Sequence, residues 1–217
     1  MNITHESEYY TNVRPNGALI YSINICKYFI PNIKTNRSWV TINTHQCVDN
    51  AIVFIHSNVD IDSKYGFLKD YKNLILVCSQ KSTMYKVRKY GHAIYLPLSI
   101  DVEYTKKFNE HAKDKSVCYA GRKGKIYSDR LRKLPNVDFL ENLSHESMLR
   151  KLSRYRNVYA VGITALEAKV LGCRILPYDD RYPDVSVWQV KDCREMIPIL
   201  QEKLDKIDGK ELEQNEM

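Results

Sequence analysis

Residues Val158–Ile175, with the sequence VYAVGITALEAKVLGCRI, carry the clearest indication of the fold. They predict a strand, a sharp turn at Gly162, a helix over 164–171 and a second strand directly after Gly172. Gly162 permits the turn because a residue without a Cβ tolerates unusual backbone angles and close approach of a ligand. Thr164 is expected to cap the helix and Gly172 to end it. A strand, a helix and a strand in this order are typical of a βαβ unit with parallel strands.

The turn at the start of this helix is a candidate anion site. Free N–H groups at a helix start attract phosphate oxygens, and the helix dipole adds to the attraction. Glu167 is expected within the first turn, where its carboxylate reaches a ribose hydroxyl while phosphates occupy the turn. The alternative is a βαβ unit whose turn binds no ligand, and on periodicity alone both interpretations stay open.

Alternating strands and helices continue along the rest of the chain. Strands are predicted over 39–43, 51–56, 73–78, 93–96, 116–120, 137–139, 158–161 and 173–176. Helices are predicted over 17–29, 81–90, 144–155, 164–171 and 193–204, with Ser144 as the cap of the third. The alternation predicts an α/β protein with two Rossmann-like lobes and parallel sheets. The expected order is a reduced first lobe over 1–100, a linker over 101–115, a second lobe over 116–206 and a polar tail over 207–217.

Composition narrows the class of protein. The chain has 217 residues, of which 44% are hydrophobic, as in a globular protein with a genuine core. No run approaches 18 apolar residues, so no transmembrane helix is expected. The polar and acidic start, MNITHESEYY, does not resemble a signal peptide, so a cytoplasmic location is expected. The six cysteines form no CxxC pair, which favours buried free thiols over a metal site or a disulfide framework.

The net charge of +7 is concentrated in the middle of the chain. Residues 1–80 carry +1, residues 81–156 carry +10 and residues 157–217 carry −4. A concentrated positive field can hold a sugar diphosphate, a nucleic-acid backbone or another anionic surface. A solvated basic face without a ligand is the alternative interpretation.

Four blocks of the chain resemble glycosyltransferases with the GT-B fold, of the glycogen-synthase-like and GT4-like group. The first is Gly162-Ile163-Thr164-Ala165-Leu166-Glu167-Ala168 with Leu171-Gly172, which resembles the donor-binding segment of that family. The others are Leu96-Pro97-Leu98-Ser99-Ile100-Asp101, Tyr119-Ala120-Gly121-Arg122-Lys123-Gly124-Lys125, and Leu134–Leu140 followed by His145-Glu146 and Leu149. The blocks follow in the family's order over roughly residues 73–180, which makes the resemblance fairly specific for the fold.

The resemblance implies a role for each block. Glu167 falls on the family's second glutamate, which grips the nucleotide ribose. The backbone from Gly162 through Ile163 and Thr164 to Ala165 binds the donor phosphates. Tyr159 stands where the family has its first glutamate, which contacts the transferred sugar, and this departure bears on turnover more than on nucleotide binding. Family members also commonly end in a long helix that returns to the first lobe, for which the end of this chain is expected to be too short and too acidic.

Positive side chains are expected to replace a metal in the chemistry. Gly121 ends a strand, and the cations after it would neutralise the donor diphosphate; Arg122 takes part, with Lys123 and Lys125 competing for the second position. Asp179-Asp180 invites comparison with an Asp-x-Asp metal site, but its spacing and its Pro-Tyr context indicate a solvated loop, and no metal site is expected.

His56 ends a predicted strand at the edge of the first lobe. There it would hydrogen-bond a sugar or act on the acceptor. A loop histidine without such a role is the commoner alternative. His45, His92 and His145 lack comparable placement.

The function expected from the resemblance is transfer of a hexose or pentose from a nucleoside-diphosphate sugar, with a UDP-linked donor favoured and no further cofactor. The acceptor and the oligomeric state are left open, with nucleic acid among the candidate acceptors. One alternative is a non-catalytic nucleotide-binding module, which Tyr159 and the reduced first lobe favour. Another is a glycosyltransferase of viral type that acts on modified DNA bases, which the basic middle third favours.

Overall fold

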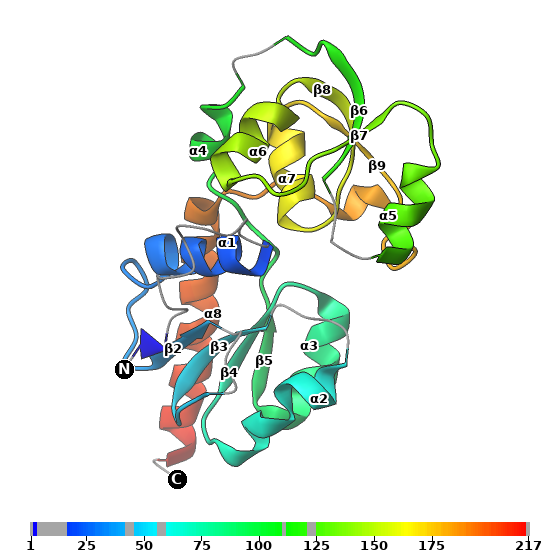
Figure 1. Ribbon diagram of the computed structural model, residues 1–217. Coiled ribbons are helices and arrows are strands. Elements are labelled where there is room, and N and C mark those ends of the chain that lie inside the picture. Colours follow the sequence, from blue (N-terminus) through cyan, green and yellow to red (C-terminus); the bar gives the residue numbers. More distant parts are fainter. Residues whose placement is uncertain are drawn as a thin grey trace. The chain divides into compact units, whose positions relative to one another are not determined.

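The computed structural model divides the chain into two compact units, each with its own parallel sheet (Figure 1). It describes residues 2–3, 17–41, 46–55, 60–109, 112–120 and 125–215. The described residues of unit 1 are 2–3, 21–98 and 193–215, and those of unit 2 are 17–20 and 99–192, with the same gaps. The predicted α/β class with two Rossmann-like, parallel-sheet units is confirmed.

The sheet of unit 1 has five parallel strands in the order β1-β2-β3-β4-β5. Their bounds are β1 (Asn2–Ile3), β2 (Ser38–Thr41), β3 (Ala51–Ile55), β4 (Ile75–Cys78) and β5 (His92–Tyr95). The helices that serve this unit are α1 (Gly17–Asn24) with a π-helical extension (Ile25–Phe29), α2 (Ile61–Tyr65), α3 (Lys81–Val87) and α8 (Cys193–Asn215), and the 3-10 helices Gly66–Asp70 and Arg88–Tyr90 follow α2 and α3. β3 and β4 are buried along their whole length, which explains why their sequences are continuous apolar runs rather than alternating ones.

Helix α8 is longer than predicted, and it belongs to unit 1. The sequence predicts a helix over 193–204 followed by a polar tail, whereas the helix spans Cys193–Asn215 and packs with residues of unit 1 (Figure 1). The buried side chain of Arg37 holds it there, because the guanidinium donates to Asp208 Oδ1 from Nε at 2.9 Å and from Nη2 at 2.7 Å. The expectation that the end of the chain is too short and too acidic for a long returning helix is therefore wrong.

The sheet of unit 2 has four parallel strands in the order β7-β6-β8-β9. Their bounds are β6 (Lys115–Tyr119), β7 (Val137–Phe139), β8 (Tyr155–Tyr159) and β9 (Arg174–Leu176). The helices are α4 (Val102–Lys106), α5 (Lys125–Arg132), α6 (His145–Leu152) and α7 (Ile163–Val170), with a 3-10 helix over Val185–Val187. Figure 1 shows α6 and α7 together on one face of this sheet and α5 on the other. The order of the strands reverses between β6 and β8.

Unit 2 begins earlier than the predicted second lobe. The predicted linker contains α4, whose N-cap is Asp101, with its carboxylate accepting from the N–H of Tyr104 at 3.0 Å. Ile100 also forms a parallel bridge with Asp192. These contacts tie the start of the segment to unit 2, so 99–109 behaves as part of this unit. Within the described part of the chain, every helix is too short or too polar to span a bilayer.

Candidate functional site

The reversal of strand order in unit 2 marks one edge of its sheet as a candidate site. β6 and β8 are neighbours, with Tyr119 opposite Tyr159, and the N–H of Ala120 donates to Tyr159 O at 3.0 Å. The segments that leave these strands therefore start side by side and turn toward opposite neighbours. In open α/β sheets, ligands bind at the carboxyl edge where the strand order reverses. The segment 160–164, which the sequence singles out, begins at this edge. Ala120, the last described residue before the cation-rich segment, lies at the same edge.

The cation-rich segment after β6 lies largely outside the described residues. Gly121, Arg122 and Lys123 are in this group. Lys125 is the first residue of α5, but its side chain is not described either. The role of these cations toward a diphosphate stays a prediction.

The turn after β8 has the backbone that the sequence predicts for Gly162. Its φ of 65° and ψ of −138° lie where side-chain-bearing residues are rarely found. Among the described residues no atom lies within 4 Å of the position that a Cβ on Gly162 would take.

The N-cap of α7 is Gly162 and not Thr164, which corrects the predicted cap. The carbonyl of Gly162 accepts from the N–H groups of Ala165 at 3.1 Å and Leu166 at 3.2 Å, and Thr164 lies within the first turn. In the part of the chain that is described, no group accepts from the N–H of Ile163 or Thr164. Among the described residues these two N–H groups, at the positive end of the helix dipole, have no acceptor, and a helix start of this kind attracts anions.

Gly172 ends α7 as predicted. Its φ is 75°, its N–H donates to Lys169 O at 2.9 Å, and the N–H of Cys173 donates to Ala168 O at 2.8 Å. These two bonds form a Schellman motif, in which a left-handed residue satisfies the last carbonyls of a helix. Helix α7 is consequently a short element fixed at both ends, and the position of its first turn relative to the sheet is well defined.

Glu167 is buried in the second turn of α7, whereas the sequence predicts it within the first turn. Its side chain is 2% exposed, and its Oε1 lies 2.6 Å from Nε2 of His145. Its Oε2 is buried and has no hydrogen-bond partner among the described residues. Helical side chains lean toward the N-terminus, so this carboxylate lies alongside the first turn. The residue occupies the expected region, but it is covered.

His145 is the site residue that the sequence interpretation misses. It is the first residue of α6, and its ring stacks on that of Tyr104 with centroids 6.0 Å apart. Ser144 caps α6 as predicted, because its Oγ accepts from the N–H of Ser147 at 3.2 Å. The sequence contains one indication of this position. His145 and Ile163 each begin a helix that follows a parallel strand, so both are expected at the carboxyl edge of the sheet. The pairing with Glu167 requires the tertiary structure.

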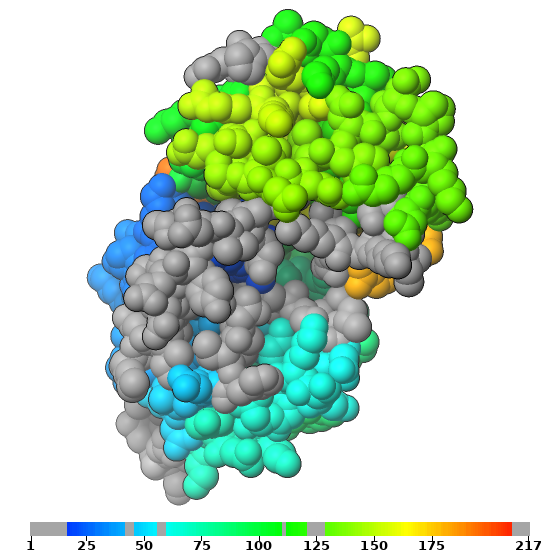
Figure 2. All heavy atoms as spheres, in the orientation of Figure 1, coloured from blue at the N-terminus to red at the C-terminus, as the bar shows by residue number. Residues whose placement is uncertain are grey.

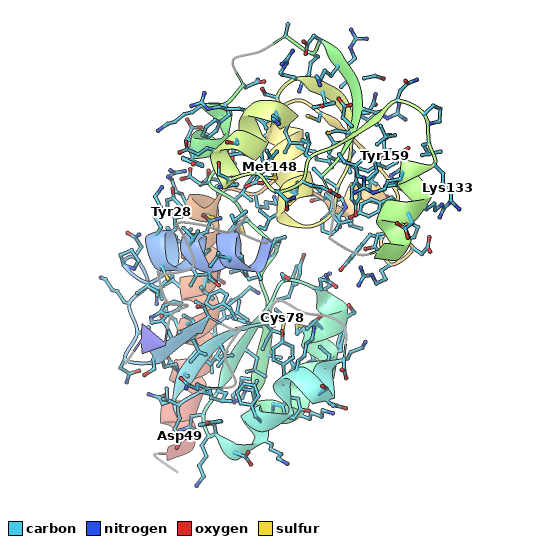
Figure 3. The ribbon with its side chains drawn as sticks, viewed as in Figure 1. Tyr28, Asp49, Cys78, Lys133, Met148 and Tyr159 are labelled. Carbon is cyan, nitrogen blue, oxygen red and sulfur yellow. The ribbon has the colours of Figure 1, made fainter. Side chains whose placement is uncertain are left out.

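Tyr159, which is labelled in Figure 3, belongs to an aromatic cluster. Its ring centroid lies 6.4 Å from that of Tyr178, and Tyr178 in turn packs edge-on against Tyr119. Leu131 of α5 contacts the same group. The position of the family's first glutamate is therefore filled by a side chain that packs between the sheet and α5.

The Asp179-Asp180 loop is partly buried, which corrects the predicted solvated loop. Asp179 is buried and accepts two bonds from the Arg181 guanidinium, from Nε at 2.8 Å and from Nη2 at 2.5 Å, and one from the Arg181 backbone N–H at 3.1 Å. Asp180 is exposed. The Asp179 carboxylate therefore forms a bidentate ion pair with Arg181. No group of three or more His, Cys, Asp or Glu residues among those described could hold a metal ion.

Nucleophilic chemistry by cysteine is disfavoured where the structure is described. The cysteines are unpaired, and all but Cys26 are buried. Burial raises the pKa of the Cys78 thiol to about 12, and it raises the pKa of the Cys118 thiol as well. A buried neutral thiol is a poor nucleophile. His56, the candidate of the first lobe, lies outside the described residues, directly after the buried end of β3.

Comparison with known proteins returns no match. No protein-family model matches the chain, and neither a curated protein nor a solved structure matches it. The function is therefore inferred from the site's own residues and geometry.

Proposed function

We propose that the protein is a glycosyltransferase that uses a nucleoside-diphosphate sugar, bound at the carboxyl edge of the sheet of unit 2. One observation carries the proposal: the strand order reverses where the Gly162 turn and the 121–125 segment leave β8 and β6. This is the place where open parallel sheets bind nucleotides. The long helix α8 in unit 1 adds support, since the resembling family commonly ends in such a helix.

In this proposal, different residues bind the diphosphate and the ribose of the donor. Arg122, with Lys123 or Lys125, meets the diphosphate, and the N–H groups of Ile163 and Thr164 complete its binding. The ribose lies beside the pair of Glu167 and His145. In the transfer, the bond from the anomeric carbon to the diphosphate oxygen breaks, and an acceptor hydroxyl oxygen forms the new bond. The cations stabilise the charge that develops on the diphosphate.

In this mechanism the acceptor hydroxyl loses its proton to a base as it attacks. His56 is the candidate for that role, because a histidine at the end of a strand can act as a general base near neutral pH. No step requires a metal ion, since cations and a helix start take over the stabilisation of the leaving group.

One rival is supported by a specific observation. Tyr159 and its aromatic neighbours fill the position of the first family glutamate, which favours a module that binds a nucleotide without transferring a sugar. Release of free sugar or of glycosylated product from a nucleotide-sugar, measured with and without hydroxyl acceptors, separates the two functions. A transferase consumes the donor faster when an acceptor is present, whereas a binding module leaves it intact in both cases.

A second rival is a transferase that acts on DNA. Exposed cations on and around α5 and α6 support it, among them Arg130, Lys133 and Lys151. The viewed face of unit 2 in Figure 2 is formed largely by the segment that carries α6. Duplex binding whose affinity falls steeply with salt would favour this rival, because phosphate contacts release counterions.

A thermal-shift experiment tests the proposal itself. UDP, ADP, GDP and their glucose conjugates are added in turn, and at least one should raise the melting temperature, because a ligand that binds the native state stabilises it. Arg122→Ala should lose this shift. Lys133→Ala is the matched control, since it removes an exposed cation directly after the end of α5 and changes no residue at the carboxyl edge. The absence of a shift with every nucleotide at millimolar concentration would overturn the proposal.

A further inference from the structure

The pair of Glu167 and His145 has a buried member and an accessible one. The side chain of Glu167 is 2% exposed, whereas that of His145 is 19% exposed. A ligand that arrives at the carboxyl edge therefore meets the imidazole before it can meet the carboxylate. The sequence expectation, in which Glu167 itself grips the ribose, would require the carboxylate to become uncovered.

The imidazole is held in one orientation by contacts on two sides. Nε2 lies within hydrogen-bonding distance of Glu167 Oε1, at 2.6 Å. The ring face is covered by Tyr104, with 30° between the two ring planes. The backbone of His145 is fixed as well, because it begins a helix capped by Ser144. Such constraints on a side chain lower the entropy that it loses on binding a ligand.

The remaining ring nitrogen, Nδ1, has no partner within the described ranges. An ionised Glu167 can only accept, so opposite it Nε2 carries the ring proton, and Nδ1 is then an acceptor in the neutral ring or a donor in the charged ring. A ribose hydroxyl both donates and accepts, so it fits either state. A buried carboxylate behind an imidazole is a known way to set its tautomer and orientation.

We propose that His145 is the residue that contacts the donor's ribose, through Nδ1, and that Glu167 acts as a positioning residue behind it. The inference rests on the proposed function, since it assumes a nucleotide at this edge. Its geometry agrees with that placement: α6 and α7 both start at the carboxyl edge, and the Glu167 carboxylate leans toward the first turn of α7, where the phosphates are expected. The ribose then lies one helical turn from the phosphates.

The decisive variant is His145→Gln. A glutamine amide reaches where Nε2 stood and donates to Glu167, so the buried carboxylate keeps a partner, but no nitrogen remains at the position of Nδ1. The matched control is His92→Gln, an exposed histidine on β5 of unit 1. Affinities are measured by calorimetry for the nucleoside diphosphate among UDP, ADP and GDP that binds best, and for its 2′-deoxy and 3′-deoxy analogues.

The wild-type protein and His92→Gln should prefer the ribonucleotide over at least one deoxy analogue by about tenfold, the value of one hydrogen bond. His145→Gln should bind all three within about twofold of one another. A preserved tenfold preference in the folded His145→Gln protein would overturn the role of His145 while leaving the proposed function intact. Failure of every nucleotide to bind would overturn both.

A second measurement does not depend on the nucleotide. Long-range proton–nitrogen spectra of the free protein should show His145 protonated at Nε2, and Glu167→Met should remove this restriction on the tautomer. A neutral ring protonated at Nδ1 in the wild-type protein would contradict the positioning by Glu167.

Discussion

Replacement of His145 by alanine should destabilise unit 2 by leaving a buried carboxylate without its partner. Glu167 is 2% exposed, Oε1 is bound only to His145 among the described residues, and Oε2 has no partner there. Leaving a buried hydrogen-bonding group without its partner costs about 1–3 kcal/mol, and more when the group is charged. Because His145 is itself 19% exposed, its removal lets water approach Oε1, so we expect a loss of about 3 kcal/mol at most.

The two tryptophans allow the loss to be assigned to one unit. Trp39 is buried in unit 1 and Trp188 in unit 2. In a Trp39→Phe background, fluorescence during urea unfolding follows Trp188 and hence unit 2. With a denaturant slope of about 2 kcal/mol per M, the midpoint should fall by about 1.5 M at most.

A second substitution, Glu167→Met, should restore part of the stability that His145→Ala loses. Glu167→Met replaces the carboxylate by an apolar side chain of similar size, and replacing both partners of a buried hydrogen bond by apolar groups can be nearly neutral or stabilising. The double variant His145→Ala with Glu167→Met should therefore be more stable than His145→Ala alone. Additive losses in the two single variants, or an unchanged midpoint for His145→Ala, would refute the reasoning.

Three further predictions concern the backbone, the pH dependence and α8. Gly162→Ala should cost about 1–3 kcal/mol in thermal unfolding, through its positive φ alone, because the space for a Cβ is open among the described residues. Burial and then the hydrogen bond to Asp138 raise the pKa of Tyr155 to about 12, so the unfolded state ionises first. The free energy of unfolding should therefore fall between about pH 10 and pH 12, and Tyr155→Phe should flatten this part of a urea titration against pH. Arg37→Ala should speed amide exchange around Asp208 by tenfold or more, since it removes charge-assisted bonds worth about 2 kcal/mol; unchanged exchange there would show that α8 is held by other contacts.

Local signals in the chain predict its elements well. Val137–Phe139 is a strand over the predicted residues, Ser144 caps α6, and Gly172 ends α7 in a left-handed conformation. Each of these depends on a few neighbouring residues, through apolar content, a capping hydroxyl or the absence of a Cβ. Short helices are missed, among them α2, which has no side-chain cap, and α4, although Asp101 caps it.

The residues of the candidate site are also predicted only where a local signal exists. The turn at Gly162 can be predicted from the sequence, because its backbone angles are rare for residues with a side chain and a glycine at this position therefore indicates a turn. Glu167 is identified as a residue of interest, but its burial and its partner are not. Asp179 is taken for a solvated residue because the sequence places it in a loop, whereas the nearby Arg181 folds back to pair with it.

Periodicity, glycines and caps thus establish an α/β chain with parallel strands and a turn suited to anions, since these properties are local. Three features depend on the tertiary structure: the reversal of strand order between β6 and β8, the return of α8 to Arg37 in unit 1, and the contact of His145 with Glu167. Each joins segments far apart in the chain, and the free energy of such a contact depends on burial and geometry that no local pattern encodes.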